Sequence, residues 1–276
     1  MPSLHSLAPL TDAARPRFRL RLGSTAPNFK AETTLGLIDF HEWIGDNWAI
    51  LFSHPEDYTP VCTTELAALA KYEPEFAKRG VKLIGLSANT VETHGGWIND
   101  IDEIAGCALS FPIIGDKDRK IAFAYDMVTT ALPCIPLTSR PFPPVSSPPN
   151  YLIFKHIYSH LHSQLDHQDT TNVDSRGIAF TIRSVFVIDP KKTIRLILSY
   201  PASTGRNTAE LLRVVDSLQA SDKHRVTTPV NWNPGEDVIV HPSVKNDEAK
   251  TLFPEFRIVK PYLRYTPLSK DVLFGS

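Results

Sequence analysis

One cysteine, Cys62, lies where a predicted buried strand ends and a predicted helix begins. The connection between them, residues 55–63, reads PEDYTPVCT. Thr59 is a suitable residue for the N-cap of the helix, and Pro60 suits its first turn, where a missing N–H costs nothing. Cys62 is therefore expected in the first helical turn, where free backbone amides and the helix dipole favour an anion.

The chemistry that this position favours is nucleophilic attack by a thiolate. An ordinary cysteine is ionised to only a few per cent at neutral pH, so a position that favours the anion increases the nucleophile many-fold. The alternative is a buried cysteine that serves only as a small apolar side chain. The helix-start position of Cys62 favours the reactive interpretation.

Alternating strand-like and helix-like segments surround Cys62 and indicate an α/β fold. Strands are predicted at residues 48–52, 81–86, 111–114, 180–188 and 194–198. Helices are predicted at residues 62–79, 91–104 and 118–127, and after a capping box that starts at Asn207. The turn sequence at 189–192 predicts that the last two strands form an antiparallel hairpin.

The helix that begins near Cys62 is amphipathic, and its predicted buried face consists of Leu66, Leu69, Ala70, Phe76 and Ala77. Lys78 and Arg79 lie in its last turn, and Gly80 is a suitable terminator. The pattern predicts that this helix packs against the sheet and fixes the position of Cys62.

Pro55, Thr59 and Cys62 form the pattern Pro-x-x-x-Thr-x-x-Cys, which resembles the active-site signature of the peroxiredoxins. Three further segments resemble the one-cysteine subfamily: FSHP at 52–55, FTIRSVFV at 180–187 and YPASTGRN at 200–207. The resemblance covers about residues 22–127 and 165–268. It implies a thioredoxin-like mixed sheet flanked by helices, followed by a small C-terminal domain often used in dimer formation.

The resemblance also implies a role for each site residue. Cys62 would be the peroxidatic thiolate, and Thr59 with the Cys62 amide would hold the peroxide in line for attack. Arg183 would stabilise the thiolate and the charge of the transition state. Pro55 would shield the thiolate from water.

Two supporting residues complete the expected site. His54 would lie beside the pocket, and Glu65 would orient the arginine network. The alternative for Arg183 is an ordinary surface position on a strand, which its place in the matched segment makes the weaker interpretation.

Attack on a peroxide leaves cysteine sulfenic acid, which a second thiol must reduce. No cysteine follows Cys134, and both Cys107 and Cys134 are expected to be non-catalytic. We therefore expect an external thiol reductant, from the glutathione or the thioredoxin system, and no cofactor or metal. The expected partners are a peroxide, this reductant and a second copy of the chain.

The bulk composition limits the other classes of function. A net charge of -1 argues against a nucleic-acid partner, and no apolar run is long enough to predict a membrane span. Three irregularly spaced cysteines indicate a reducing compartment, so a cytoplasmic location is expected. The mitochondrial alternative depends on residues 1–22, where four arginines accompany a single acid.

Composition divides the chain into an N-terminal extension at 1–22, a thioredoxin-like domain at 23–127 and 165–221, and a C-terminal domain at 222–276. Residues 128–164 interrupt the main domain with a proline-rich stretch that contains no acidic residue. We interpret this insertion as a translated retained intron that is disordered. Its first residue is Val128 and its last is Gln164, whose codons can supply the usual GT and AG ends. The alternative is a genuine loop of this branch of the family.

Two other functions compete with peroxide reduction. The protein could be a peroxide sensor or chaperone-like oligomer with little turnover, which the intact signature disfavours. Some members of the subfamily are credited with phospholipase activity, but Asn47 replaces the serine nucleophile and Lys191 the aspartate, although His41 remains. His156 and His160 have metal-ligand spacing, yet no supporting carboxylate or cysteine pair accompanies them.

Overall fold

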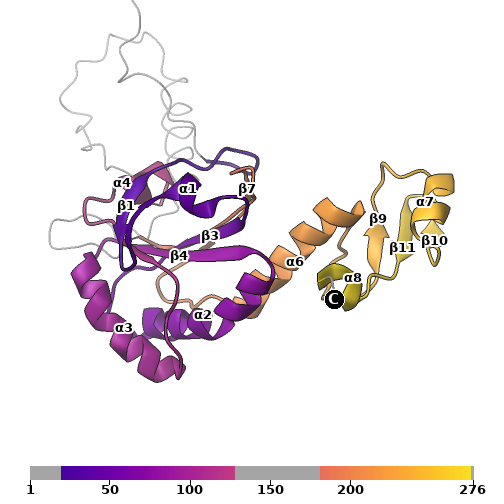
Figure 1. Ribbon diagram of the computed structural model, residues 1–276. Helices are drawn as coiled ribbons and strands as arrows, with labels where there is room; N and C mark the ends of the chain where they lie inside the picture. The colour runs from indigo at the N-terminus through magenta and orange to yellow at the C-terminus, as the bar shows by residue number, and fades with distance from the viewer. Residues whose placement is uncertain (1–19, 128–180, 275–276) are drawn as a thin grey trace, which may run out of the picture.

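The computed structural model describes residues 20–127 and 181–274, and these form a mixed seven-stranded sheet with helices on both faces (Figure 1). The strands run in the order β2-β1-β5-β4-β3-β6-β7. Their bounds are β1 (Lys30–Thr33), β2 (Gly36–Asp39), β3 (Trp48–Ser53), β4 (Val81–Ser87), β5 (Ile113–Gly115), β6 (Arg183–Ile188) and β7 (Ile194–Tyr200). The thioredoxin-like mixed α/β fold is therefore confirmed.

The centre of the sheet is parallel and its sides are antiparallel. β3 pairs in parallel with β4, and β4 with β5, because the helices between them carry the chain back across the sheet. β6 pairs antiparallel with both β3 and β7, so the predicted hairpin of the last two strands is confirmed. This pairing brings the start of β6 beside the end of β3.

Two hydrophobic clusters fill the two faces of the sheet. β3 contributes to both, since successive strand residues point to opposite faces: Ile50 and Phe52 belong to one cluster, Ala49 and Leu51 to the other. The helices are α1 (Phe40–Ile44), α2 (Pro60–Lys78), α3 (Val91–Ala105), α4 (Lys120–Ala124) and α6 (Thr208–His224).

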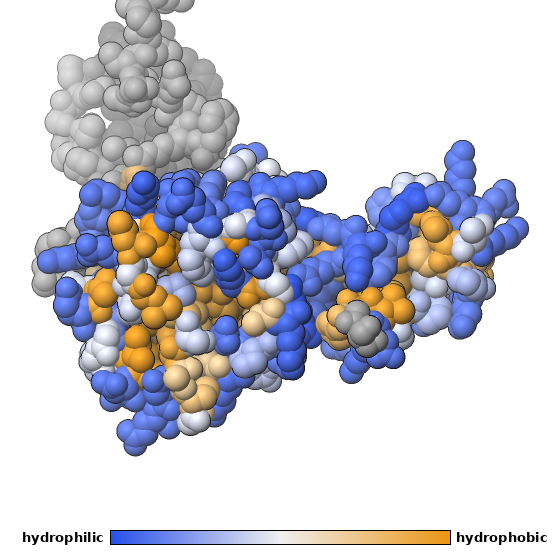
Figure 2. All heavy atoms as spheres, viewed as in Figure 1, coloured by the Kyte–Doolittle hydropathy of each residue, from blue (hydrophilic) through white to orange (hydrophobic). Residues whose placement is uncertain are grey.

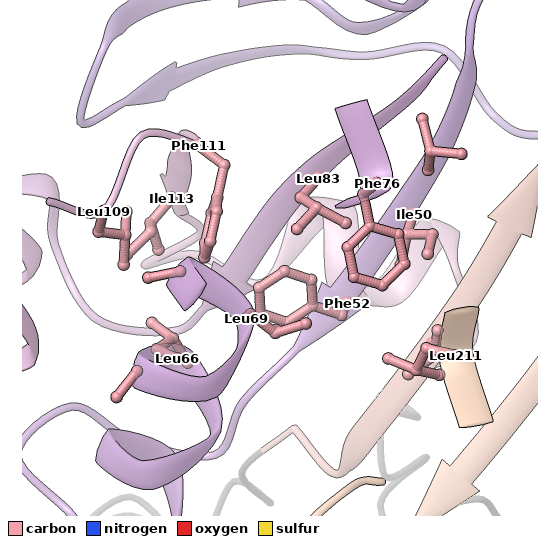
Figure 3. Close-up of a cluster of buried hydrophobic side chains, with 14 of the residues drawn as sticks. Ile50, Phe52, Leu66, Leu69, Phe76, Leu83, Leu109, Phe111, Ile113 and Leu211 are labelled. Carbon is pink, nitrogen blue, oxygen red and sulfur yellow. The ribbon is translucent and has the colours of Figure 1, made fainter. Parts of the chain in front are cut away.

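α2, α3 and α6 cover the face that contains Phe52, and Figure 3 shows side chains of α2 and α6 packed there. Leu66 and Leu69 of α2 and Leu211 of α6 pack there, and all three are almost completely buried. Burying a leucine side chain contributes about 1.5 to 3 kcal/mol, so this face holds α2 firmly in place. The first turn of α2, with Cys62, is thereby fixed at the end of β3.

The last part of α2 differs from the prediction, because Ala77 is exposed. Phe76, one residue earlier, is fully buried and is the last buried residue of the helix, so the buried face ends before Ala77. Two other predicted elements are shorter than expected. The helix predicted at 118–127 is α4, which spans only Lys120–Ala124. The strand predicted at 111–114 is β5, which spans Ile113–Gly115.

A second, smaller unit follows α6 and stands apart from the main sheet in Figure 1. Its four strands run in the order β10-β11-β9-β8. Its elements are β8 (Val226–Thr227), β9 (Val238–Val240), α7 (Asn246–Leu252), β10 (Arg257–Lys260), β11 (Leu263–Thr266) and α8 (Lys270–Phe274). Trp232, Val238 and Leu268 are buried in a cluster that also includes Ala220 of α6. α6 continues to His224, past the start of the C-terminal domain placed at residue 222 from composition.

Candidate active site

The loop between β3 and α2 places Cys62 as expected. α2 begins at Pro60, and Thr59 occupies the N-cap position with extended backbone angles. The Thr59 side chain does not cap the helix, however, because its hydroxyl donates to the Glu56 carbonyl at 2.9 Å. The first in-helix amide bond runs from Thr63 to the Thr59 carbonyl at 3.0 Å, so the Cys62 amide precedes the regular ladder.

Cys62 is fully buried and lies against an arginine. The Nη1 atom of Arg183 is 3.3 Å from the Cys62 Sγ. Arg183 is the first residue of β6, and it reaches Cys62 because β6 pairs with β3, the strand that leads into α2. A guanidinium at this distance stabilises a thiolate more than a thiol, since it is always charged.

A carboxylate shared by two arginines holds this guanidinium in place. Glu65 accepts from Arg183 Nη1 at 2.6 Å and from Arg206 Nη2 at 2.7 Å. Arg206 also donates its Nε and its backbone N–H to Glu65. Arg183 is fixed further by two bonds to the Ala202 carbonyl, at 3.1 Å and 2.7 Å. The guanidinium therefore has one available orientation toward Cys62.

The charges of this cluster do not cancel. Two arginines and one glutamate give +1 (two positive minus one negative), and all three side chains are nearly inaccessible to solvent. A buried net charge is costly unless a counter-charge compensates it. A Cys62 thiolate would supply that counter-charge.

The ionisation of Glu65 follows from the same contacts. Burial alone would raise the pKa of Glu65, but its hydrogen bonds with Arg206 and the charges of Arg206 and Arg183 outweigh burial. The pKa of Glu65 is consequently held below its ordinary value of 4.5. Glu65 is thus a carboxylate at neutral pH and acts only as an acceptor for the two arginines.

A pocket of about 200 Å³ opens over this cluster. Pro55, Thr59 and Arg183 line it, together with Glu56, Pro60, Val61 and Ala202. Cys62 lies behind the lining, and Arg183 is the residue that both lines the pocket and contacts the sulfur. The volume suits a small peroxide better than a bulky thiol.

His54 belongs to a second buried cluster, with two residues that the sequence analysis did not name. Its Nε2 is 2.8 Å from Asp57 Oδ1, and the other Asp57 oxygen is 2.7 Å from His94 Nδ1. Among the described residues, His54 Nδ1 is buried without a hydrogen-bond partner. The three side chains offer ligand-type atoms within 4.8 Å of one another, and the two bonds with Asp57 engage one ring nitrogen of each histidine.

The structure thus brings the predicted residues into three groups. Cys62, Glu65 and Arg183 are in direct contact, Pro55 and Thr59 line the pocket with Arg183, and His54 hydrogen-bonds to Asp57.

Arg206, Asp57 and His94 are site residues that the sequence did not predict. Arg206 lies inside the segment YPASTGRN, and a buried Glu65 needing several donors was a signal for it. His94 precedes Trp97 by three residues on one face of α3, and such a face is more often only core.

The end of the main domain opposite the pocket contains a larger groove of about 810 Å³. Asn47 and Lys191, which stand where a lipase would need serine and aspartate, both line it. His41 is bonded to the Ala26 carbonyl at 2.8 Å. Cys107 is an exposed free cysteine. Cys134, the paired His156 and His160, and the insertion at 128–164 lie outside the described residues.

Comparison with known proteins identifies two matching family profiles. The AhpC/TSA family matches residues 22–197, and the C-terminal domain of 1-Cys peroxiredoxin matches residues 217–255. Among curated proteins, mitochondrial peroxiredoxin PRX1 of Saccharomyces cerevisiae is 51% identical over 249 residues, which cover 90% of this chain and 81% of the relative. Human peroxiredoxin-6 is 43% identical over 258 residues, covering 90% of this chain and 97% of the relative.

Two solved structures are similar over most of their length. A mutant of peroxiredoxin 6 from Arenicola marina has a TM-score of 0.73 and 38% identity, covering 91% of this chain and 99% of that chain. The yeast mitochondrial 1-Cys peroxiredoxin, solved to explain thiol resolution by the glutathione and thioredoxin systems, has a TM-score of 0.69 and 49% identity. That match covers 90% of this chain and 100% of the yeast chain.

Proposed function

The chain belongs to the peroxiredoxins, in their one-cysteine branch, and from this premise we propose that Cys62 is the residue through which it reduces peroxides. A peroxiredoxin is a thiol-dependent peroxidase, an oxidoreductase that needs a reactive cysteine. The observation that carries the assignment is the 3.3 Å contact between Arg183 Nη1 and the Cys62 sulfur, in a buried cluster with surplus positive charge.

The proposed reaction begins with attack of the Cys62 thiolate on the terminal peroxide oxygen. The sulfur–oxygen bond forms as the oxygen–oxygen bond breaks, and cysteine is oxidised to sulfenic acid while the peroxide is reduced. The departing oxygen takes a proton and leaves as water or an alcohol. Hydrogen peroxide and organic hydroperoxides both fit this scheme, because only the terminal oxygen must reach Cys62.

The other site residues hold the peroxide during this step. We assign to the Thr59 hydroxyl and the Cys62 amide the contacts that align the oxygen–oxygen bond with the sulfur. Arg183 would stabilise the negative charge that moves from sulfur to the departing oxygen. Pro55, which is buried and lines the pocket, would exclude water.

An external thiol completes the proposed cycle. Cys62 is fully buried, so a reductant must displace part of the pocket wall to reach the sulfenic acid. Cys107 is exposed and does not lie beside Cys62 in this buried cluster. In the yeast mitochondrial 1-Cys peroxiredoxin, thiol resolution proceeds via the glutathione and thioredoxin systems. We propose the same two systems as candidate reductants for this chain.

The decisive experiment adds one equivalent of hydrogen peroxide to the reduced protein and locates the new oxygen by mass spectrometry after trapping sulfenic acid. The expected result is a single modification on Cys62. Modification of Cys107 with an unmodified Cys62 would overturn the assignment. Sustained turnover with glutathione or a thioredoxin system separates an enzyme from a peroxide sensor or chaperone-like oligomer, which would consume one equivalent only.

We also propose a homodimer. β7 is an edge strand of the main sheet, and in the C-terminal unit Ile258, Val259 and Tyr262 are 53%, 47% and 81% exposed. Figure 2 shows apolar side chains on the surface of this unit. Exposed apolar side chains and open strand edges are both stabilised by a second copy. Sedimentation of the reduced protein at micromolar concentration should give a dimer, and a monomer would contradict this proposal.

For the cellular location we favour mitochondria over the cytoplasm. The relative that is 51% identical is named as mitochondrial, and residues 1–22 are rich in arginine. Among the described residues, none of the helices is long and apolar enough to cross a membrane. A fluorescent fusion should co-localise with mitochondria and lose this location when residues 1–22 are removed. A uniformly cytoplasmic full-length fusion would contradict the assignment.

A further inference from the structure

The contacts of the buried cluster around Asp57 specify where its hydrogens lie. A backbone carbonyl can only accept, so the 3.1 Å contact between His94 Nε2 and the Ile114 carbonyl requires hydrogen on Nε2. The other ring nitrogen, Nδ1, contacts Asp57 Oδ2 at 2.7 Å. If Asp57 is a carboxylate, that nitrogen must also donate.

Asp57 is indeed held as a carboxylate by its partners. Burial alone would raise the pKa of Asp57, but hydrogen bonds from His54 and His94 outweigh burial and keep its pKa below the ordinary value. A carboxylate can only accept, so both of its oxygens accept from histidine rings. His94 therefore has hydrogen on both of its nitrogens. The backbone N–H of Asp57 donates separately to Asn89 Oδ1 at 3.2 Å.

His54 is in the opposite state. Complete burial lowers the pKa of His54, and the nearby charge of Arg206 acts in the same direction. Its single ring hydrogen must lie on Nε2, which donates to Asp57 Oδ1. The buried Nδ1 is therefore left as a bare acceptor.

The same contacts hold the loop that forms the pocket wall. Asp57 lies between Glu56 and Thr59, two residues that line the pocket. Tyr58, the next residue, has a φ of 54°, a left-handed conformation that a tyrosine adopts only when its surroundings enforce it.

α3 lies against this loop. His94 binds Asp57, and the Tyr58 hydroxyl lies over Gly96, where an added Cβ would be 2.6 Å from it and would make the ring move.

We infer that Asp57 and His94 form a buried ion pair that positions the active site, by fixing His54 in its Nε2-protonated form and by fastening the pocket loop to α3. Both are positioning residues, because neither lines the pocket nor contacts Cys62. The pair is neutral as a whole, and the charge that favours the thiolate remains with Glu65, Arg183 and Arg206. The effect on peroxide reduction rests on the proposed function; the protonation states do not.

The first test measures those protonation states directly. Nitrogen-15 NMR of histidine-labelled, reduced full-length protein at about pH 7.5 should show two protonated nitrogens in His94 and one, Nε2, in His54. Assignment comes from His94→Gln and His54→Gln spectra. A His94 ring with a single hydrogen in the wild-type protein would overturn the ion pair, whether or not the protein reduces peroxide.

The second test separates the hydrogen bonds of Asp57 from its charge. In Asp57→Asn, the amide oxygen can accept from His54 Nε2 and the amide nitrogen can donate to His94 Nδ1. We expect His94 to lose one ring hydrogen, His54 to keep its tautomer, and the second-order rate with hydrogen peroxide to stay within about threefold. Asp57→Ala removes both bonds and should reduce that rate roughly ten- to a hundredfold, as loss of a supporting shell does at other sites.

Asp216→Ala is the matched control. Asp216 is buried like Asp57, and its substitution removes the bonds to Arg79. It lies at the opposite end of α2 from the pocket. Its thermal stability should fall while its peroxide rate stays at the wild-type value. A wild-type rate in Asp57→Ala, or equal losses in Asp57→Asn and Asp57→Ala, would overturn the positioning role. If the wild-type protein failed to reduce peroxide, the proposed function would fail while the NMR test of the ion pair would stand.

Discussion

The two ends of α2 contain charged networks that differ in net charge. At the first turn, one carboxylate, Glu65, binds two arginines. At the last turn, Arg79 binds two carboxylates, Glu75 and Asp216, and Lys78 also pairs with Glu75. The first network sums to +1 (two positive, one negative) and the second to zero (two positive, two negative).

This difference explains why only one end is suited to thiolate chemistry. A surplus positive charge that is buried beside a cysteine stabilises the thiolate and the charge of a transition state. The groove at the other end is larger, yet Asn47 supplies no nucleophile there and its buried carboxylate, Asp216, already has a partner. Pocket size alone would therefore have selected the wrong end of the molecule.

The largest expected effect comes from Cys62→Ser. Serine is not ionised near neutral pH, so peroxide reduction should fall to the uncatalysed level while the fold is kept. The measurement is the rate of peroxide consumption with an excess of thiol reductant. Cys107→Ser is the matched control and should retain the wild-type rate, and full activity in the Cys62 variant would remove Cys62 from the mechanism.

Arg183→Ala tests the surplus charge at the first network. A charge-assisted contact contributes about 1.5 to 3 kcal/mol, which corresponds to a loss of about ten- to 150-fold in the second-order rate. Stopped-flow measurement of the reduced protein with hydrogen peroxide gives this rate. Arg79→Ala removes an arginine from the other network and should leave the rate unchanged; equal losses in both variants would mean that the two ends do not differ.

Acid unfolding should show opposite signs at the two ends. The folded-state pKa of Glu65 is lowered from 4.5, so its contribution is present above that value and is lost as pH falls through the lower folded pKa. The folded-state pKa of Asp216 is raised from 3.8, chiefly by burial. Its contribution is present below 3.8 and is lost as pH rises through the raised folded pKa.

Urea unfolding between about pH 3 and pH 6 measures these contributions as differences from Glu65→Gln and Asp216→Asn. The advantage of the wild-type protein over Glu65→Gln should grow as pH rises. Its advantage over Asp216→Asn should shrink over the same range. Parallel pH profiles for the two variants would contradict the assigned ionisation.

The smallest expected effect is that of deleting residues 128–164, which contain none of the proposed site residues. The residues that flank the gap in the described structure, Met127 and Thr181, are both buried in the main domain. We propose that the shortened chain reduces peroxide at least as fast and unfolds at least as high in temperature as the full chain. Sequencing of transcripts tests the retained-intron interpretation, and mature messages that uniformly keep this segment would contradict it.

The local features around Cys62 could be predicted from the amino-acid sequence. The buried run at 48–52, Pro60 in the first helical turn and the apolar face with Leu66 and Leu69 are set by neighbouring residues, and all are present in the structure. The alternation of strands and helices, and with it the fold class, follows from the same local periodicity. The role of Arg183 came from resemblance, because no local rule connects a strand residue with a cysteine so distant in the chain.

Which arginines and histidines pair with each buried carboxylate depends on the folded chain and could not be predicted from local sequence patterns. Arg183 and Arg206 reach Glu65 across 118 and 141 positions of sequence, and a carboxylate's number of partners depends on the strands and loops packed around it. The same holds for Asp57 and His94, which are 37 positions apart. Periodicity shows which residues are buried, but it does not show which buried polar groups meet. Those pairings set the protonation states, because hydrogen bonds and desolvation act through space.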